Sequence, residues 1–443
     1  MAREPDDLLT LLRRTGPLAG GDLARALGVS PATLSRAYAR HQTQVCRMGK
    51  TRGVRYALRR PVRGLGTPVP VYTVDSKGRA RPAGELSPLA NGQHWFEPAT
   101  DTQGPGILYA GLPPYCVDMA PQGFLGRGFA ALHPELGLPE RLTDWTDDHR
   151  LIAIAKHGED CVGNLIVGQE SMDRFLASSP PEGHGSYTTL AQEASEGDAG
   201  SSAGGEQPKF TTYDGEHHLI VKFTPGDGSA ADERWRDLLI CEAIGARHVH
   251  AGIGLATAIR WLDQGSRRFL ESRRFDRVGE RGRYGVLSLA SVSDEWLGTR
   301  DNWIEAARLL SKDRMIDPET ARTIRWLEAF GRLIGNNDRH FGNITFTAEE
   351  TLSPPGLELA PAYDMLPMRL APTAAGVPPL VPAIPRQTAD LLDVWGPAVR
   401  AARRFWEEIE ATAEIGKAFR MFAADMVQAL PAGSDDVGGG GSP

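Results

Sequence analysis

A polar loop between an apolar helix and an apolar strand constrains this chain more than any other feature. Residues 335–344 read GNNDRHFGNI. Before them, PETARTIRWLEAFGRLIG has a helical apolar period, and after them ITFT is typical of a strand. The loop places Asp338 and Asn343 five residues apart, with His340 between them. A lone aspartate here is more often a turn residue that ends a helix, so any chemistry depends on what else meets the loop.

Further charged groups lie on elements that can reach this loop. GLELAPAYDML brings Asp364 to the end of a second predicted strand, and a hairpin would return it close to Asn343. Upstream, Lys222 lies inside the predicted strand LIVKFTP, where it faces either solvent or an anionic group. Asp237 and Glu242, on the helix that follows, are two acids that could pair with it. The sequence does not choose between them.

These residue types together indicate metal-assisted phosphoryl transfer. The reaction needs a carboxylate that orients the attacking hydroxyl, oxygen ligands for Mg²⁺ and a cation on the phosphates. The spacing Asp-x-x-x-x-Asn is that of the protein-kinase catalytic loop. We therefore expect Asp338 to be catalytic, Asn343 and Asp364 to hold Mg²⁺, and Lys222 to contact ATP. His340 and Arg339 would support the loop or the phosphates. An oxygen-rich set of this kind suits Mg²⁺ rather than zinc.

Residues 176–206 are poor in apolar side chains and rich in Gly and Ser. A loop of this length inside a compact domain is usually functional or disordered. It leads into a predicted hairpin with strands at 209–213 and 218–223. Backbone N–H groups of such a loop can cradle phosphates, although a flexible linker is the commoner structure.

The N-terminus differs from the rest of the chain in charge. Residues 1–63 hold 13 Lys and Arg against 4 Asp and Glu, a net charge of +9, and the remainder carries −16. A basic segment attached to an acidic body indicates contact with nucleic acid.

The same segment has the pattern of a winged helix-turn-helix. A helix at 6–15 is followed by GGDLARALGVSPATLSRAYARH, which predicts two helices around a turn at Gly28, with Ser30 as N-cap of the second. The basic run VCRMGKTRGVRYALRR predicts a hairpin wing. The expected DNA contacts are Thr33, Ser35, Arg36 and Arg40 on the second helix and Lys50, Arg52 and Arg55 on the wing. The alternative is a small helical domain with an incidental basic face.

The remaining sequence is typical of a soluble globular protein. Residues 65–175 hold short apolar runs that predict a β-rich region, 267–277 read as a strand, and 301–335 and 394–430 read as helices. The four scattered cysteines predict free thiols in the cytoplasm, and no run predicts a membrane-spanning helix.

Five segments in a fixed order carry a family resemblance. SSAGGEQPKF, LIVKF, RRFDR, GNNDRHFGNI and LAPAYDML resemble the HipA family of toxin serine/threonine kinases. The fused helix-turn-helix and the loop version GSSAGGEQPKF are most similar to the YjjJ branch of that family. The resemblance spans residues 65–430. It implies an α+β architecture in which an N-terminal winged helix-turn-helix precedes a bilobal, kinase-like fold with a β-rich N-lobe and a mainly α-helical C-lobe.

The expected domains follow from the resemblance and the composition. They are residues 1–62 (winged helix-turn-helix), 63–175 (β-rich N-terminal subdomain of the kinase), 176–276 (N-lobe with the Gly/Ser-rich phosphate loop), 277–431 (helical C-lobe with the catalytic loop) and 432–443 (flexible tail).

The resemblance also assigns roles to individual residues. Asp338 would match the catalytic base, Asn343 and Asp364 the Mg²⁺ ligands, and segment 269–275 the adenine-contacting hinge. The implied ATP-binding residues are Lys222, Ser202, Ala203, Gly204, Gly205, Gln207, Lys209 and His340. Ser202 falls where the family carries an inhibitory autophosphorylated serine, with Ser201 one residue away. A phosphoserine there would eject the loop by adding charge beside the phosphates.

The function implied is that of an ATP- and Mg²⁺-dependent toxin kinase in a type II toxin–antitoxin-like system. Its implied partners are operator DNA through residues 1–60, a protein substrate such as a translation component, an antitoxin and a second copy of the chain. The best-known members carry the DNA-binding motif on a separate antitoxin, so the fusion leaves the need for an antitoxin open. Two alternatives stay open: a lipid kinase, whose catalytic loop DRHFGNI also resembles, and a DNA-binding regulator whose kinase-like body only senses nucleotide.

Overall fold

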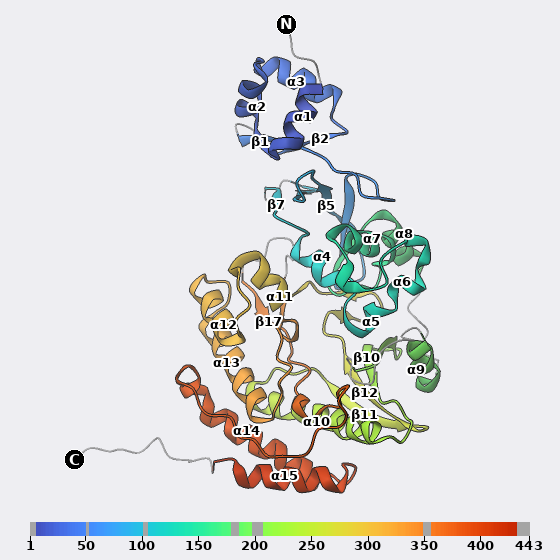
Figure 1. The fold of residues 1–443 in the computed structure, drawn as a ribbon, viewed down its shortest axis with the longest axis vertical. Coiled ribbons are helices and arrows are strands. Elements are labelled where there is room, and N and C mark those ends of the chain that lie inside the picture. Colours follow the sequence, from blue (N-terminus) through green and yellow to red (C-terminus); the bar gives the residue numbers. More distant parts are fainter. Residues whose placement is uncertain are drawn as a thin grey trace, which may run out of the picture. The chain divides into compact units, whose positions relative to one another are not determined.

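The structure is a computed structural model and is drawn in Figure 1. It describes residues 6–49, 53–100, 105–178, 186–196, 207–348 and 356–431. The chain separates into two compact units, Met1–Gln122 with His133–Ser178 and Gly123–Leu132 with Ser179–Pro443. The short helices α5 (Gly123–Arg127) and α6 (Phe129–Leu132) therefore belong to the second unit, although the sequence around them belongs to the first.

The first unit begins with three helices and a small antiparallel sheet. The helices are α1 (Asp6–Thr15), α2 (Gly20–Leu27) and α3 (Pro31–Arg40), and the strand order is β1 (Leu18–Ala19), β3 (Arg55–Leu58), β2 (Val45–Met48). Gly28 ends α2 with a φ of 65°, which favours glycine. Ser30 caps α3 by accepting a hydrogen bond of 3.2 Å from the backbone N–H of Thr33. Leu23, Leu27 and Leu34 are buried in one cluster, so α2 and α3 pack against each other through these side chains.

The rest of the first unit is built on a five-stranded antiparallel sheet. Its order is β7 (Ile107–Tyr109), β6 (His94–Pro98), β5 (Ala80–Pro88), β4 (Val69–Val74), β8 (Leu165–Val167). The helices are α4 (Pro114–Met119), α7 (Asp147–His157) and α8 (Gln169–Ala177), with short turns at η3 (Pro134–Leu136) and η4 (Leu142–Asp144). Helix α7 starts at a capping box between Thr146 and His149 and ends at His157.

The second unit contains a four-stranded antiparallel sheet of order β11 (Ile259–Gln264), β12 (Arg267–Arg273), β10 (His218–Phe223), β9 (Lys209–Tyr213). Strands β9 and β10 form the predicted hairpin. Leu219, Val221 and Phe223 enter an apolar cluster on one face. Because side chains alternate along a strand, Lys222 points to the other face, which the long helix α10 (Ala230–Ile253) covers through Leu239 and Ala243.

One expected loop is partly a helix. Residues 176–206 predict a loop, but α9 (Tyr187–Glu196) is helical and places Tyr187, Leu190 and Ala191 against the apolar cluster of the sheet. Its apolar residues do recur at helical spacing, but they are few and lie between Gly- and Ser-rich stretches. Packing against the sheet therefore decides the conformation of this segment, since so short a helix is marginal alone.

The predicted strand at 267–277 is too long. Strand β12 ends at Arg273, which pairs with Leu219, and β10 itself begins only one residue earlier, at His218, whose carbonyl accepts a last hydrogen bond of 2.9 Å from Arg274 N–H. Phe275 lies in the following turn and stacks on Tyr363, with ring centroids 5.9 Å apart.

Most of the remaining second unit is helical. Its helices are α11 (Leu289–Val292), α12 (Trp303–Lys312), α13 (Pro318–Leu333), α14 (Leu392–Ala411) and α15 (Lys417–Ala429), with a π-helical turn at Ser293–Leu297 and 3-10 turns η6 (Phe341–Asn343), η7 (Met368–Leu370) and η8 (Ala389–Leu391). Asn302 and Asp317 cap α12 and α13. Figure 1 shows α14 passing close to α10 and α15, and these helices contact one another.

Two small sheets connect these helices to the loop at 335–344. Strands β13 (Arg277–Val278) and β14 (Gly282–Arg283) pair with each other, and β15 (Val286–Ser288), β16 (Thr345–Thr347) and β17 (Glu358–Leu359) form a three-stranded sheet. The predicted pairing after the loop is present, because Phe346 lies opposite Leu359. Within the described ranges, no helix is both long enough and apolar enough to cross a membrane.

Candidate active site

Lys222 lies at the centre of a buried cluster of charges. Its Nζ donates to Glu242 Oε1 at 2.7 Å and to Oε2 at 2.8 Å, and it also pairs with Asp364. Glu242 is the partner because the α10 face of the sheet receives Lys222. Asp237, the other acid that the sequence offered, instead accepts a hydrogen bond of 2.8 Å from the backbone of Gly416.

The cluster holds one cation and two carboxylates, and their pKa values respond to each other. Burial disfavours the charged form of Lys222, but Asp364 and Glu242 more than offset this, so the pKa of Lys222 is raised. Burial also raises the pKa of Glu242, an effect that Lys222 opposes. For Asp364 burial acts in the same direction, but Lys222 and Lys209 outweigh it and lower the pKa to about 2. Asp364 is therefore an ionised carboxylate at neutral pH.

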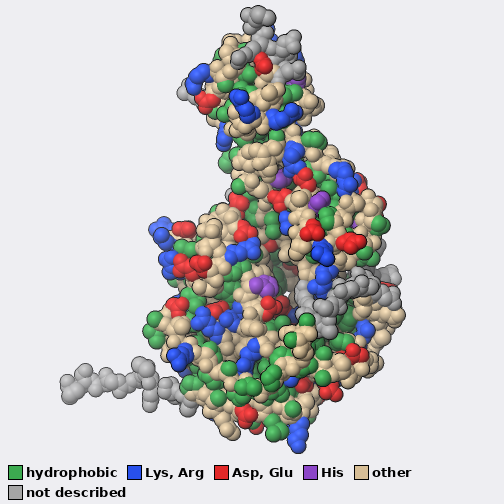
Figure 2. All heavy atoms as spheres, in the orientation of Figure 1, with side chains coloured by type: hydrophobic (Ala, Val, Ile, Leu, Met, Phe, Trp, Pro, Cys, Tyr) green, Lys and Arg blue, Asp and Glu red, His purple; other side chains and the backbone are tan. Residues whose placement is uncertain are grey.

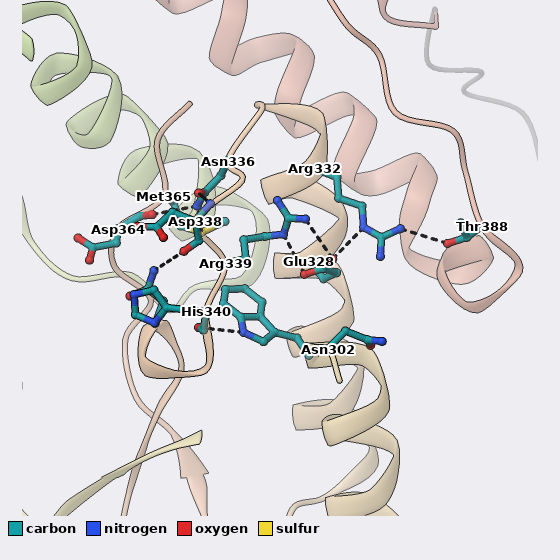
Figure 3. A network of polar contacts seen from close by, with 12 residues as sticks. Asn302, Glu328, Arg332, Asn336, Asp338, Arg339, His340, Asp364, Met365 and Thr388 are labelled. Carbon is teal, nitrogen blue, oxygen red and sulfur yellow. Dashed lines mark hydrogen bonds and ion pairs between the residues drawn. The ribbon is translucent and has the colours of Figure 1, made fainter. Parts of the chain in front are cut away.

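Asn336 links the polar loop to Asp364. Its side chain is buried, its Oδ1 accepts from the backbone N–H of Asp338 at 3.0 Å, and its Nδ2 donates to the backbone carbonyl of Asp364 at 3.0 Å. Figure 3 shows Asn336 between these two residues. One amide side chain thus sets the separation of the two carboxylate-bearing segments.

The loop closes on itself between Asp338 and Asn343. Asn343 Nδ2 donates to the backbone carbonyl of Asp338 at 2.8 Å, and the N–H of His340 donates to the same carbonyl at 2.9 Å. His340 Nδ1 accepts from Gly342 N–H at 3.0 Å, and Trp303 on α12 donates to the carbonyl of His340 at 3.2 Å. The loop is therefore held by hydrogen bonds between its own residues and by one from Trp303 on α12.

Glu328 anchors the same loop to helix α13. It accepts from Arg339 at 2.9 Å and from Arg332 at 2.8 Å, as Figure 3 shows. The sequence left Arg339 to support either the loop or the phosphates, and in the structure it contacts Glu328. Arg339 therefore belongs to the scaffold of the loop.

Asp364 has an unusual backbone. Its φ of 55° lies in the left-handed region, where among the described residues only one other non-glycine residue, Arg314, is found. Such strain persists only where the surroundings enforce it. Gly245 on α10 is one such constraint, because a Cβ at that position would lie 2.1 Å from the carbonyl oxygen of Met365.

These groups surround one pocket of about 510 Å³. Its lining includes six residues expected from the sequence: Gln207, Lys209, Lys222, Asp338, His340 and Asp364. Asn343 is buried and holds the Asp338 carbonyl, but it is not part of the lining. Ser201, Ser202, Ala203, Gly204 and Gly205 lie outside the described residues.

Comparisons with known proteins agree on one family. A model of the YjjJ-like toxin middle domain matches residues 65–176, and a model of the HipA-like C-terminal domain matches residues 201–432. Toxin YjjJ of Escherichia coli (strain K12) is 35% identical over 441 residues, which cover 95% of this chain and 97% of that protein. The chain belongs to the HipA-like toxin family.

The HipA-like assignment is also seen in the fold. A chain of the Shewanella oneidensis MR-1 toxin–antitoxin complex of HipA, HipB and operator DNA aligns with a TM-score of 0.52 and 17% identity, over 81% of this chain and 95% of that chain. The shared feature at this identity is the mixed α+β fold alone. Helicobacter pylori proinflammatory kinase CtkA aligns with a TM-score of 0.36 and 14% identity, over 51% of this chain and 88% of that chain, a likeness too weak to carry an argument.

Two residues of this HipA-like site had no assigned role in the sequence. Asn336 read as one half of an Asn-Asn turn, and Glu328 as one polar residue of an amphipathic helix. The sequence signal for the role of Asn336 is weak. Gly335, with a φ of 77°, follows the end of α13 and turns the chain so that Asn336 enters the interior. The sequence shows the turn but not which amide faces inward.

The expected DNA contacts of this family member lie on helix α3 and on the expected wing, far along the chain from the pocket residues. Ser35, Arg36 and Arg40 are exposed on α3, whereas Thr33 is half-buried and bonds to Ser30 Oγ at 3.0 Å. Arg55 is exposed but donates to the carbonyl of Pro17 at 3.1 Å. Lys50 and Arg52 lie outside the described residues. Figure 2 shows blue Lys and Arg side chains spread over this part of the chain.

Proposed function

We propose that this HipA-like toxin is an ATP- and Mg²⁺-dependent serine/threonine protein kinase with its own DNA-binding segment. The observation that carries the proposal is the clamp on Lys222. A buried lysine held by Glu242 from a neighbouring helix, beside Asp364 and facing Asp338 across one pocket, is the arrangement that phosphoryl transfer uses to place a cation on phosphates. A lysine of purely structural use would not need two carboxylates in a pocket wall.

Each residue of the pocket has a part in this proposal. Asp338 accepts the hydrogen bond of the attacking hydroxyl and orients it. Lys222 contacts the ATP phosphates while Glu242 keeps its side chain extended, and Lys209, opposite Lys222 in the β9–β10 ladder, adds a second cation. Gln207 offers a further contact, since its buried Oε1 has no hydrogen-bond partner among the described residues. His340 borders the same space.

The donor atoms fit a magnesium ion. Asp364 supplies an ionised carboxylate, and Asn343, whose Nδ2 is committed to the Asp338 carbonyl, has its amide oxygen to offer. Oxygen ligands of this kind suit Mg²⁺, and the excess of carboxylate over lysine in the cluster favours a second cation. Bound there by Asn343 and Asp364, the ion would neutralise charge on the phosphates.

The segment before β9 remains part of the proposal by resemblance. It would bind phosphates with residues 202–205, and Ser202 or Ser201 would be autophosphorylated. Because phosphorylation adds charge and acceptor oxygens, it would expel the segment from a site that already binds phosphates.

The proposed partners rest on the N-terminal helices and on the relatives. Operator DNA would bind through residues 1–60, with α3 in the major groove, and a dimer would read a palindrome. The aligned Shewanella chain comes from a complex that contains HipB and operator DNA, which supports an antitoxin and DNA as partners here. The substrate proposed by resemblance is a protein of the translation machinery.

The test is transfer of labelled phosphate. Purified wild-type chain, shown by mass spectrometry to start unphosphorylated, is incubated with Mg²⁺ and γ-labelled ATP beside Asp338→Asn. Label on Ser201 or Ser202 in the wild type alone is the expected result. An unlabelled wild type that binds ATP by calorimetry would overturn the kinase and favour a DNA-binding regulator that senses nucleotide.

A further inference from the structure

Three metal-binding side chains meet in the first unit, outside the kinase-like site. His133 precedes the short turn η3, Glu135 lies within that turn, and His157 is the last residue of α7. Glu135 Oε1 lies 3.5 Å from His133 Nδ1 and 3.3 Å from His157 Nε2, and all three ligand atoms lie within 4.8 Å of one another. Both imidazoles are half-buried and Glu135 is exposed, so the cluster opens to solvent.

These distances match the edges of a tetrahedral metal site. Zinc binds imidazole nitrogen and carboxylate oxygen at about 2.0–2.2 Å, which separates neighbouring ligand atoms by roughly 3.3–3.5 Å. Two of the three edges of the cluster already have this length. The third edge, between the two imidazoles, is no longer than 4.8 Å, and closing it to the same length would complete three corners and leave the fourth for water.

The two imidazoles also suit a metal more than a pair of cations. Their rings are stacked, with centroids 3.7 Å apart and planes 27° from parallel. A neutral imidazole is the form that binds a metal ion.

The backbone around the cluster is held in place. Arg63 donates to the carbonyls of Leu136 and Gly137, the latter at 3.1 Å, and Leu136 N–H donates to the backbone carbonyl of His133 at 3.1 Å. His157 is fixed by helix α7, whose middle turn is buried. Ligands on fixed backbone lose little entropy on binding, which favours affinity.

We propose that His133, Glu135 and His157 bind a divalent transition-metal ion of the Zn²⁺ class. Two nitrogens and one oxygen select such an ion over Mg²⁺, which prefers oxygen ligands alone. The ion would tie η3 to the end of α7. Because Arg63 holds the same turn and follows β3 along the chain, the ion would also stiffen the connection between the N-terminal helices and the five-stranded sheet.

The test measures Zn²⁺ binding to the full chain, purified without a histidine tag and stripped with a chelator. Calorimetry is run on wild type, on the double variant His133→Ala/His157→Ala and on Glu135→Gln. His250→Ala, which removes an exposed histidine elsewhere, is the matched control, and Cys161→Ser excludes binding by the partly exposed thiol. Co²⁺ replaces Zn²⁺ in a parallel titration, because its visible spectrum reports coordination geometry.

We expect one Zn²⁺ per wild-type chain with affinity unchanged in His250→Ala and Cys161→Ser. The double variant should bind at least about 100-fold more weakly, since even outer groups of metal sites change affinity by 10–100-fold. Glu135→Gln replaces an exposed side chain, so it tests the site even if the double variant does not fold, and it should also weaken binding. Wild-type affinity in Glu135→Gln and the double variant, or no stoichiometric binding by wild type, would overturn the proposal.

Discussion

Lys222 shows how much of the site depends on one charge. With it, two buried carboxylates share a cation; without it, Glu242 and Asp364 face each other uncompensated. Breaking a buried ion pair by removing one partner typically costs about 3–5 kcal/mol, because the other charge stays buried. Stability and activity should therefore change together at this position.

Lys222→Met is expected to lower phosphate transfer by at least about 100-fold, because the cation on the phosphates is lost. It should also lower the urea midpoint of the second unit, followed by circular dichroism. Lys312→Met is the matched control: it removes an exposed lysine at the end of α12 that is not part of the pocket lining. A Lys222→Met chain as active as wild type would rule out the proposed role.

Glu242 should make the stability of the second unit depend on pH. Its pKa is raised in the folded chain from 4.5 to about 7, so the folded state holds the proton more tightly than the unfolded state. The stabilisation from this proton is complete below about 4.5 and is lost as the pH rises towards 7. Asp364, whose pKa is lowered, acts in the opposite direction but at lower pH.

As the pH rises from 4.5 to 7, the urea midpoint of wild type should fall relative to that of Glu242→Gln, whose side chain cannot titrate. Midpoints measured at intervals across this range check the sign. A difference between the two chains that stays constant with pH would show that Glu242 does not titrate there.

At this scale the sequence supplied candidate residues but not their contacts. Spacing singled out Asp338 and Asn343, the predicted hairpin added Asp364, and Lys222 stood out among apolar neighbours. Glu242 could not be chosen over Asp237, because the choice depends on which turn of α10 faces the sheet. That rotation is set by packing between residues far apart in sequence.

Two glycines allow close approaches between the helices and the segments that carry the site residues. Gly245 lets the Asp364–Met365 backbone approach the helix, and Gly331 similarly faces Arg339, although there the nearest atom belongs to a flexible side chain. A Cβ added at Gly245 would have to displace backbone atoms, whereas a Cβ added at Gly331 would only have to displace the Arg339 side chain.

Gly245→Ala is expected to destabilise the second unit by about 1–3 kcal/mol through overpacking and to reduce ATP affinity by displacing Asp364. Gly331→Ala should cost less, because Arg339 Cδ, 2.6 Å from the added Cβ, can shift. Gly21→Ala on α2, where the added Cβ meets nothing within 4 Å, is the neutral control. Equal effects at Gly245 and Gly21 would contradict the close approach.

Helix α3 should bind DNA through its exposed basic side chains. Arg36→Ala/Arg40→Ala is expected to weaken operator binding and to reduce the slope of log affinity against log salt by about 2, one for each lost phosphate contact. Arg25→Ala on α2 is the matched control, since Arg25 is exposed but pairs with Asp22. A mobility shift unchanged by the double variant at several salt concentrations would remove α3 from the interface.

Helices and strands were predicted best where capping or turn residues and the apolar periodicity agree within one segment of the sequence. The β9–β10 hairpin and helices α2, α3, α12 and α13 lie close to where the sequence places them. Helix α9 was missed because its few apolar residues gain order only from the sheet they cover.

At the scale of the whole molecule, the chain divides into two compact units, and each unit is made of two separate stretches of the sequence. Residues 123–132 leave the first unit and join the second, where Phe124 packs edge-on against Phe223 of β10 with ring centroids 6.5 Å apart. A division of the chain into consecutive residue ranges cannot describe this segment, because it belongs to a different unit from the residues on either side of it. The two units should nonetheless respond separately to ligands that bind only one of them.

Mg²⁺ with a non-hydrolysable ATP analogue is expected to raise the unfolding temperature of the second unit alone. At 100 times the dissociation constant the stabilisation is about 2.7 kcal/mol. Differential scanning calorimetry of wild type and Lys222→Met, with and without ligand, measures it, and chelating the magnesium should reverse it. A shift of every transition by the same amount would show that the two units unfold as one.

The order of elements along the chain sets when a ribosome could release an active product. The basic helices α1–α3 are complete within the first 40 residues, whereas Asp338, Asn343 and Asp364 emerge late, and α14, which packs on α10 and α13, later still. At the usual pace of translation this gap lasts on the order of tens of seconds. A nascent chain would therefore carry the helices proposed to bind DNA for that interval before the proposed phosphate site is complete, and a chain cut short by a premature stop would never complete it.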